Sequence, residues 1–354
     1  MTRSRRPARL DAARQRGAAL LIALLTVTLI ATFAATALWQ QWRMTEIEAA
    51  ERARVQSAWV LIGALDWSRL ILREDARASG ASPADHLAEP WAVPLEEAKL
   101  TTFLAADRNI ASDALEGLPE AFLSGQILDA QARLNVRNLV KAGQPAPNAV
   151  AAFQKLFELL GLPTGQVSTL TDALRRASPP AAAPTGAEGG TGSSGVTGLA
   201  ATAGTEGAPL MPQRVTELVW LGLSPSTVAA IEPYVTVLPA ETPLNINTAS
   251  AEAIYASVPN LDLACARRLV EQRQRKFFAQ VQEAAEAIQQ CGIQFLPGEQ
   301  SVSTSYFEVR GRLRLERTWV EERSLLFRNG MVLNVVWRER GAGTTDAATK
   351  APGS

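Results

Sequence analysis

The sequence predicts an α+β protein with one long N-terminal helix, a small antiparallel sheet and a large inserted all-α domain. Three patterns predict this fold. An uncharged stretch runs from Gly17 to Trp42 and leads into an amphipathic helical pattern. Helical patterning fills most of residues 137–300, and alternation of apolar and charged residues predicts a strand over Tyr306 to Leu315.

The composition argues against most classes of enzyme. The 354 residues are 47% apolar, and 35 Lys and Arg balance 35 Asp and Glu, so no global basic field exists to attract nucleic acid. The chain has one histidine, His86, and two cysteines. A Ser-His-Asp or Cys-His site must use His86, and a four-ligand zinc site lacks enough ligands. The sequence therefore predicts that the protein is not an enzyme.

The first forty residues predict a membrane anchor. Residues 3–16 carry six arginines against Asp11 alone, and no charge lies between Gly17 and Trp42. A helix over residues 18–39 is roughly 30 Å long, which matches the hydrocarbon layer. The positive-inside rule predicts that the arginines stay in the cytoplasm. The chain after Arg43 is then expected on the opposite side of the membrane.

Three kinds of leader fit this anchor. A cleaved secretory signal would use Ala35-Thr36-Ala37, and a plain anchor would keep Met1. No Gly or Pro interrupts the chain between Gly17 and Gly63, which disfavours the secretory signal. The third kind is a short basic peptide that ends in Gly17 and abuts Ala18. It resembles the class III leader of type IV pilins and pseudopilins, which implies a prepilin peptidase cut between these two residues.

The helix is expected to continue beyond the membrane. Apolar residues between Val55 and Leu72 fall on one face, while Glu and Arg cover the rest. This pattern predicts a helix from Ala18 to about Glu74. Residues 79–119, rich in Pro and Asp, are expected to form a loop with one short helix.

The middle of the chain mixes strand, helix and low-complexity patterns. Residues 125–136 are expected to form a strand pair around a turn, and helices are expected at Asn148 to Leu160 and Thr169 to Arg176. Residues 178–208 hold 27 Ala, Gly, Thr, Pro or Ser, so they are expected to form a flexible insertion. Further helices are expected over residues 215–223, 225–234 and parts of 244–292.

The C-terminal region changes to a period of two. Strands are expected over Tyr306 to Leu315, Thr318 to Arg328 and Val332 to Arg338, with Asn329-Gly330 as a hairpin turn. These strands predict a three-stranded antiparallel meander. Residues 341–354 are expected to be a disordered tail.

A motif between Leu244 and Phe278 looks like a helix-hairpin-helix unit. Its quoted residues are Asn245, Asn247, Thr248, Ala249, Pro259 and Arg273. Such units in competence-type DNA receptors bind the duplex backbone through a glycine-rich hairpin. Here the hairpin, residues 259–263, has no glycine and carries Asp262, so we expect a structural hairpin and no binding of nucleic acid.

The two cysteines, Cys265 and Cys291, are predicted to form a disulfide. They lie in one helical subdomain and face an oxidising compartment. Two independently buried thiols are the alternative.

The order of these motifs resembles one family, the K-type minor pseudopilins of type II secretion (general secretion pathway protein K). The resemblance rests on the leader and spine, Trp91, residues 129–135, Leu156 to Leu162, residues 244–278 and the last strands. It implies a pilin-like body over residues 40–136, an inserted helical domain over 137–300 with a helix-hairpin-helix-like unit, and a completing meander over 301–340.

The same resemblance implies location, partners and function. It implies an inner-membrane protein with a cytoplasmic N-terminus and a periplasmic bulk, which caps the pseudopilus tip and helps initiate its assembly. Its implied partners are the minor pseudopilins I and J, the major pseudopilin, prepilin peptidase and the inner-membrane assembly platform.

Calcium is possible by resemblance alone, because the chain has no run of clustered carboxylates. We therefore commit to no cofactor and no metal site. A membrane-anchored DNA receptor is the alternative function. A periplasmic hydrolase would need a polar constellation that we cannot assemble from these residues.

The fifth residue after the expected cleavage site is Ile22. In ordinary pilins and pseudopilins this position is glutamate, which pairs with the N-terminal amine of a neighbouring subunit. An apolar residue is expected where no subunit lies ahead, as at a tip. Ile22 as an ordinary membrane residue is the alternative.

Overall fold

A computed structural model of the chain describes residues 11–78, 80, 84–101, 120–178, 209–315 and 318–342. The first ten residues of the expected leader, nearly all of the low-complexity stretch 178–208 and nearly all of the expected tail lie outside the described residues. The chain divides into two compact units, residues 1–60 and 61–354. Each unit is described by itself.

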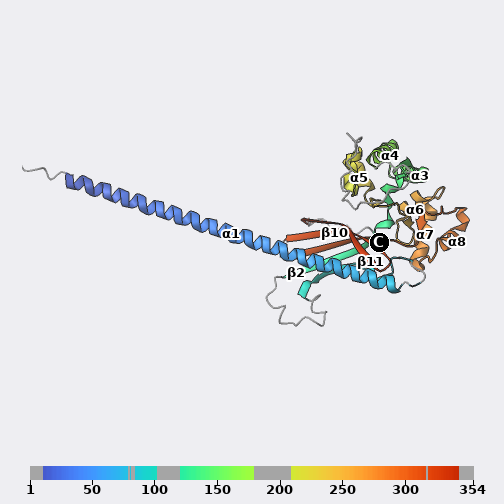
Figure 1. The fold of residues 1–354 in the computed structure, drawn as a ribbon, viewed down its shortest axis with the longest axis horizontal. Helices are drawn as coiled ribbons and strands as arrows, with labels where there is room; N and C mark the ends of the chain where they lie inside the picture. The colour runs from blue at the N-terminus through green and yellow to red at the C-terminus, as the bar shows by residue number, and fades with distance from the viewer. Residues whose placement is uncertain are drawn as a thin grey trace, which may run out of the picture. The chain divides into compact units, whose positions relative to one another are not determined.

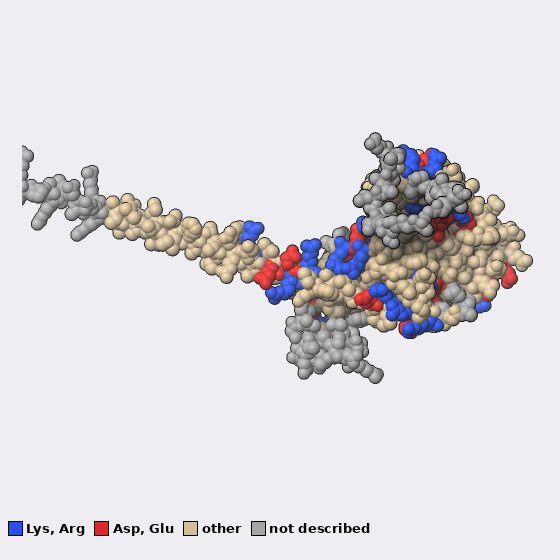
Figure 2. Space-filling view, in the orientation of Figure 1, with Lys and Arg blue, Asp and Glu red and all other residues tan. Residues whose placement is uncertain are grey.

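One helix, α1, dominates the N-terminal part of the chain. It runs from Asp11 to Ala78 over 68 residues, so it begins before and ends slightly after the predicted helix. From Ala18 onward it is long and apolar enough to cross a membrane by length and composition. In the part of α1 that begins at Ala18, Figure 2 shows a stretch without charged side chains, followed farther along the helix by a group of charged ones.

The second unit contains a five-stranded antiparallel sheet in the order β1-β2-β9-β10-β11. The strands are β1 (Leu95–Lys99), β2 (Ala121–Asp129), β9 (Tyr306–Leu315), β10 (Thr318–Asn329) and β11 (Val332–Ala342). The predicted meander is confirmed as β9-β10-β11. Figure 1 shows the teal strand β2 beside the red C-terminal strands, although the whole insert separates them in the chain.

Two expectations about this region are wrong. Residues 79–119 contain β1 in addition to the short helix η1 (Pro90–Ala92), so the stretch is more than a loop. Residues 125–136 do not form a strand pair. They hold the end of β2, the 3-10 turn η3 (Ala130–Ala132) and β3 (Leu134–Asn135), which pairs in parallel with the distant β6 (Val235–Thr236).

The part of α1 after Leu61 packs on one face of the sheet. The shared core contains apolar side chains of the helix, of the η1 region and of four strands: Leu65, Leu72, Trp91, Ile127, Phe307, Val309, Leu326 and Leu333. Two glycines face each other across β2 and β9, Gly125 and Gly311. A Cβ atom on Gly311 would lie 3.3 Å from Cδ2 of Leu61, so the glycine permits the close approach of the helix.

The insert between β2 and β9 is mainly helical. Its helices are α3 (Pro147–Leu159), α4 (Gly165–Ala177), α5 (Pro225–Ile231), α6 (Ala251–Ser257), α7 (Leu263–Arg275) and α8 (Val281–Ala287). The 3-10 segments are η4 (Val136–Leu139), η5 (Val215–Leu221) and η6 (Gln289–Cys291). The expected helix at 215–223 is therefore a 3-10 helix followed by a left-handed Gly222.

The insert also contains short strands, so it is not purely helical. Besides the β3–β6 pair, β4 (Val140–Lys141) pairs with β5 (Gln144–Pro145), and β7 (Leu244–Asn245) pairs with β8 (Gln300–Ser301). Fully buried side chains such as Phe153, Leu156 and Ile254 form its core. The insert thus has a hydrophobic core separate from that under α1.

Cys265 and Cys291 form a disulfide, with Cα atoms 6.6 Å apart. It joins the first turn of α7 to η6 across 26 positions of the sequence. The bond closes the part of the insert that contains α7 and α8.

We expect the disulfide to stabilise the insert by roughly 3–4 kcal/mol, because closing a loop of this length lowers the conformational entropy of the unfolded chain by that free energy. Labelling the unfolded, unreduced protein with a thiol reagent should modify no cysteine, and reduction should lower the midpoint of urea unfolding. Two reactive thiols per chain before reduction would disprove the bond.

Candidate functional site

Polar side chains from five parts of the second unit meet at one buried place. We call it the polar junction, and its residues come from α1, the segment before η1, β2, the insert, and the β8–β10 region. They are Asp75, Asp85, Glu89, Asp129, Asn245, Thr248, Thr304 and Arg328. Buried polar groups need partners, so their arrangement fixes how these elements sit together.

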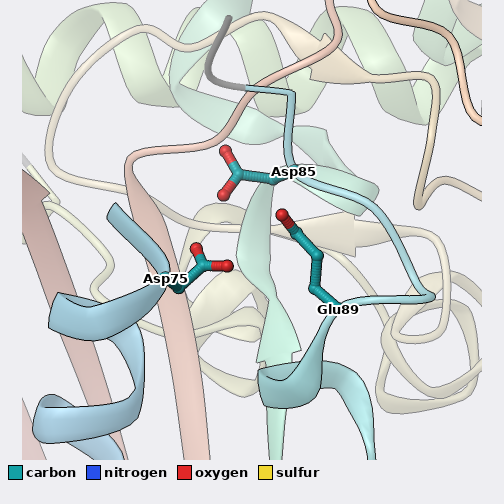
Figure 3. A group of neighbouring side chains, drawn as sticks. All are labelled: Asp75, Asp85 and Glu89. Atoms are coloured by element: carbon teal, nitrogen blue, oxygen red, sulfur yellow. The ribbon is translucent and has the colours of Figure 1, made fainter. Parts of the chain in front are cut away.

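Three carboxylates of the junction lie close together. Figure 3 shows the side chains of Asp75, Asp85 and Glu89 directed toward one another, and their nearest oxygens lie within 4.8 Å. The guanidinium of Arg328 lies among them: Nη1 is 3.0 Å from Oδ2 of Asp75, and Nη2 donates to Asp85. Nη2 also donates to the carbonyl of Thr304 at 2.9 Å. One cation thus links α1, the segment before η1 and β10.

The protonation of this cluster is shifted. Burial raises the pKa of Asp85 to about 6, although Arg328 and the amide of Thr304 act in the opposite direction. Burial also raises the pKa of Glu89 to about 7, and the nearby Asp75 and Asp85 add to the rise. Glu89 is held by two N–H donors, the amide of His86 at 2.8 Å and Nε1 of Trp91 at 2.7 Å.

The cluster does not fit a calcium ion. Calcium takes six to eight oxygen ligands. Among the described residues, Asp75, Asp85 and Glu89 form a group of acidic side chains close enough to share an ion. Arg328 already forms ion pairs with two of them, Asp75 and Asp85. The positive charge at this place is supplied by the chain itself.

Two residues at the start of the helix-hairpin-helix-like motif, Asn245 and Thr248, belong to the same junction. Nδ2 of Asn245 donates to the carboxylate of Asp129 at 2.8 Å and to the carbonyl of Asp85 at 3.1 Å. The hydroxyl of Thr248 donates to the same oxygen of Asp129 at 2.6 Å. Burial raises the pKa of Asp129, and these donors oppose the rise. The motif therefore attaches the insert to the end of β2.

The other quoted motif residues serve the interior of the insert. Asn247 exchanges two hydrogen bonds with the backbone of Phe278, at 2.9 and 3.0 Å, and Ala249 is fully buried. Nη1 of Arg273 donates to the carbonyl of Ile246 at 2.6 Å, and burial lowers the pKa of Arg273 to about 10. Pro259 is exposed on the hairpin. Only Asn245 and Thr248 of this set reach the junction.

Three backbone carbonyls between α6 and α7 accept hydrogen bonds from one lysine side chain. Nζ of Lys155, from α3, donates to the carbonyls of Tyr255, Val258 and Leu261 at 2.7, 3.0 and 2.7 Å. At the start of α7, the carboxylate of Asp262 accepts the amide of Cys265 at 2.6 Å. A phosphate needs free amides at this point, and the amide of Cys265 is occupied by an internal carboxylate. The geometry therefore gives no support to the DNA-receptor hypothesis.

The membrane-proximal positions lie on α1 in the first unit. Gly17 and Ala18 are in its helical backbone, and the side chain of Ile22 is 64% exposed, as are its apolar neighbours along the helix. These positions belong to the first unit, and the polar junction belongs to the second.

The sequence patterns do not indicate the two most connected residues of the junction, Asp85 and Arg328. Arg328 is the last residue of an expected strand, and Asp85 belongs to no predicted motif. One signal was available: Arg328 follows Leu325-Leu326-Phe327, and a charge next to such an apolar run indicates a buried, paired side chain.

Comparisons with known proteins agree on one family. Protein-family models described as "Type II secretion system (T2SS), protein K" match residues 132–240 and 244–304. The chain is 28% identical over 305 residues to type II secretion system protein K of Pseudomonas aeruginosa, covering 85% of each chain. It is 27% identical to the protein of the same name from Pectobacterium carotovorum, covering 93% of this chain and 97% of that one.

A solved structure has a similar fold. It is the crystal structure of the GspK-GspI-GspJ complex from the type 2 secretion system of enterotoxigenic Escherichia coli, with a TM-score of 0.57 and 19% identity. The match covers 82% of this chain and 98% of that one.

We expect stability to fall as pH rises from about 4.5 to about 7, because the folded chain keeps protons on Asp85 and Glu89 that the unfolded chain has lost. The Arg133 and Arg310 guanidinium groups lower the pKa of Glu308 to about 2 against the effect of burial, so Glu308 changes the stability only below this pH window.

The Glu89→Gln variant should remove about 1 kcal/mol of this loss of stability, after a discount for partial exposure. Urea unfolding at several pH values measures this, with the exposed Glu96→Gln as control. An unchanged slope in Glu89→Gln would contradict the assignment.

The Lys155→Met variant should lose about 1–2 kcal/mol of unfolding free energy, because the carbonyls of Tyr255, Val258 and Leu261 lose their donor while the side-chain volume is kept. Lys141→Met is the matched control, since the Lys141 ammonium lies 3.7 Å from Glu241 on the surface with 73% of its side chain exposed. Equal losses in the two variants would show that the carbonyl contacts of Lys155 contribute nothing.

Proposed function

The chain belongs to the protein K family of type II secretion systems, and from this premise we propose that it caps the tip of a periplasmic pseudopilus and helps to initiate its assembly. The one observation that carries the proposal is α1, a single helix that is uncharged from Gly17 to Trp42 and whose last part contributes to the core of a pilin-like body. A subunit of this kind assembles by packing its long N-terminal helix against the helices of neighbouring subunits.

The position within the pseudopilus follows from Ile22. A cut between Gly17 and Ala18 would make it the fifth residue of the mature chain. A glutamate at that position would be stable in lipid only beside the N-terminal amine of a subunit ahead. Isoleucine requires no such partner, which supports the place of the subunit at the tip.

Location and partners are proposed on the same basis. The arginine-rich residues 3–16 favour a cytoplasmic N-terminus, and a disulfide in the insert is compatible with an oxidising periplasm. The similar structure was solved as a complex with GspI and GspJ, so we propose the I- and J-type minor pseudopilins as neighbours. The major pseudopilin, prepilin peptidase and the inner-membrane assembly platform are the further partners expected of a pseudopilin.

The Ile22→Glu variant tests the tip position. We expect it to weaken tip assembly or to place the subunit along the shaft, because the new carboxylate can pair with the amine of a subunit ahead. The readouts are N-terminal sequencing of the mature chain, secretion, and the distribution of tagged subunits along isolated filaments. Leu21→Glu is the control, since it adds the same charge at about the same depth, one residue away from the fifth position.

Three outcomes contradict the proposal. Wild-type subunits spaced along the shaft would exclude a cap. Identical behaviour of the two glutamate variants would show that the charge alone causes the defect. A mature chain that does not begin at Ala18 would remove the premise that Ile22 is the fifth residue.

A further inference from the structure

The two edges of the sheet differ in length and chemistry. The β1 edge is five residues long, carries Glu96, Glu97 and Lys99, and has an irregular register between Leu95 and Ala98. Such features protect an edge strand against pairing with other chains. The β11 edge is eleven residues long and exposes the apolar side chains of Val332, Val335 and Val336 in its first half. Its ladder with β10 is regular up to Val335, and a register shift follows between Leu325 and Leu326 of β10, so that Val336 has no opposite residue. Residues 332–335 are thus the regular and apolar part of this edge.

On alternate residues of this half the main-chain groups point away from β10, and one of these groups is already bonded to a side chain of α1. The carbonyl of Leu333 accepts a hydrogen bond from Nη2 of Arg69 at 3.0 Å, and the amide of its opposite residue, Arg328, donates to Ser305 at 2.7 Å. Leu333 and Arg328 therefore form a non-hydrogen-bonded pair, and the next residue with outward main-chain groups is Val335. Among the described residues, no strand other than β10 pairs with β11.

A cavity lies beside this open edge. Its volume is about 280 Å³, and it is bordered by Val336 and Trp337 of β11, by Met211 to Gln213, and by Val237 to Pro239 of the insert. Most of these side chains are apolar. An open strand edge with an adjacent apolar cavity is the arrangement that strand addition uses, because the edge supplies main-chain bonds and the cavity accepts a side chain of the added strand.

We propose that β11 is a docking edge, where an extended strand of another minor pseudopilin pairs with Leu333 to Val336 and places an apolar side chain in the cavity. This proposal rests on the proposed function. The docked segment is a strand, because the edge has main-chain donors and acceptors that a strand can pair with. It belongs to a minor pseudopilin, because the similar structure was solved as a complex with two of them. A second copy of this chain is not expected, since a tip has one cap.

Site-specific photo-crosslinking of the full-length chain in secreting cells tests the proposal. The photoreactive residue p-benzoylphenylalanine is placed at Asn334, which is exposed on β11, or at Glu96, which is exposed on β1. We expect Asn334 to give an adduct that mass spectrometry identifies as an I- or J-type pseudopilin. Glu96 should give no such adduct.

A matched pair of variants tests the pairing itself. Val335→Pro and Val335→Ala both remove the valine side chain, and only the proline removes the outward amide. We expect the adduct yield from Asn334 to drop roughly tenfold in Val335→Pro and much less in Val335→Ala. If Val335→Pro does not accumulate, Val332→Lys places a charge on the same edge without altering the main chain and should lower the yield.

The outcomes separate this proposal from the proposed function. Equal yields in the proline and alanine variants, or an adduct with the outer-membrane channel or with a second copy of the chain, would overturn strand addition. So would the absence of an adduct while the I- and J-type pseudopilins still co-purify with the wild-type chain. If these pseudopilins do not co-purify with the wild-type chain at all, the proposed function itself fails.

Discussion

The attachment of the insert depends on one buried carboxylate, that of Asp129. It stands at the end of β2 and accepts hydrogen bonds from Asn245 and Thr248, which lie 116 and 119 positions later in the chain. An unpartnered carboxylate at this depth would be strongly destabilising. Because both oxygens are satisfied, the second through the amide of Gln131 at 2.7 Å, the start of the motif has one position relative to the sheet. The β7–β8 pair and the contacts of Asp85 follow from that position.

Parts of the fold that depend on sequence periodicity could be predicted. The apolar stretch and the one-sided pattern after it predict α1, and alternation predicts β9, β10 and β11. The strand β1 was missed because Leu95-Glu96-Glu97-Ala98-Lys99 does not alternate and is preceded by prolines. The strand pair expected over residues 125–136 does not form, because β3 pairs with a distant strand and not with β2. The partner of β3, strand β6, lies about a hundred residues away, and no local pattern indicates such a pairing.

The candidate site could be predicted only in fragments. The phrase from Asn245 to Ala249 was recognised, but its role depends on Asp129, Asp85 and Phe278, which come from other parts of the chain. Lys155 shows the same limitation. It is an ordinary helix residue by sequence, and its role depends on three carbonyls contributed by residues 255–261. Contacts between distant segments are decided by the fold, so a single sequence gives little information about them.

The place where the insert leaves the sheet has a mechanical consequence. Its two connections start from β2 and β9, which are adjacent strands joined by a long antiparallel ladder. A load applied along the sheet is therefore carried as shear by the ladders that join β2, β9 and β10, and it bypasses the insert. A domain that bears no load can change in length without weakening the structure that transmits force.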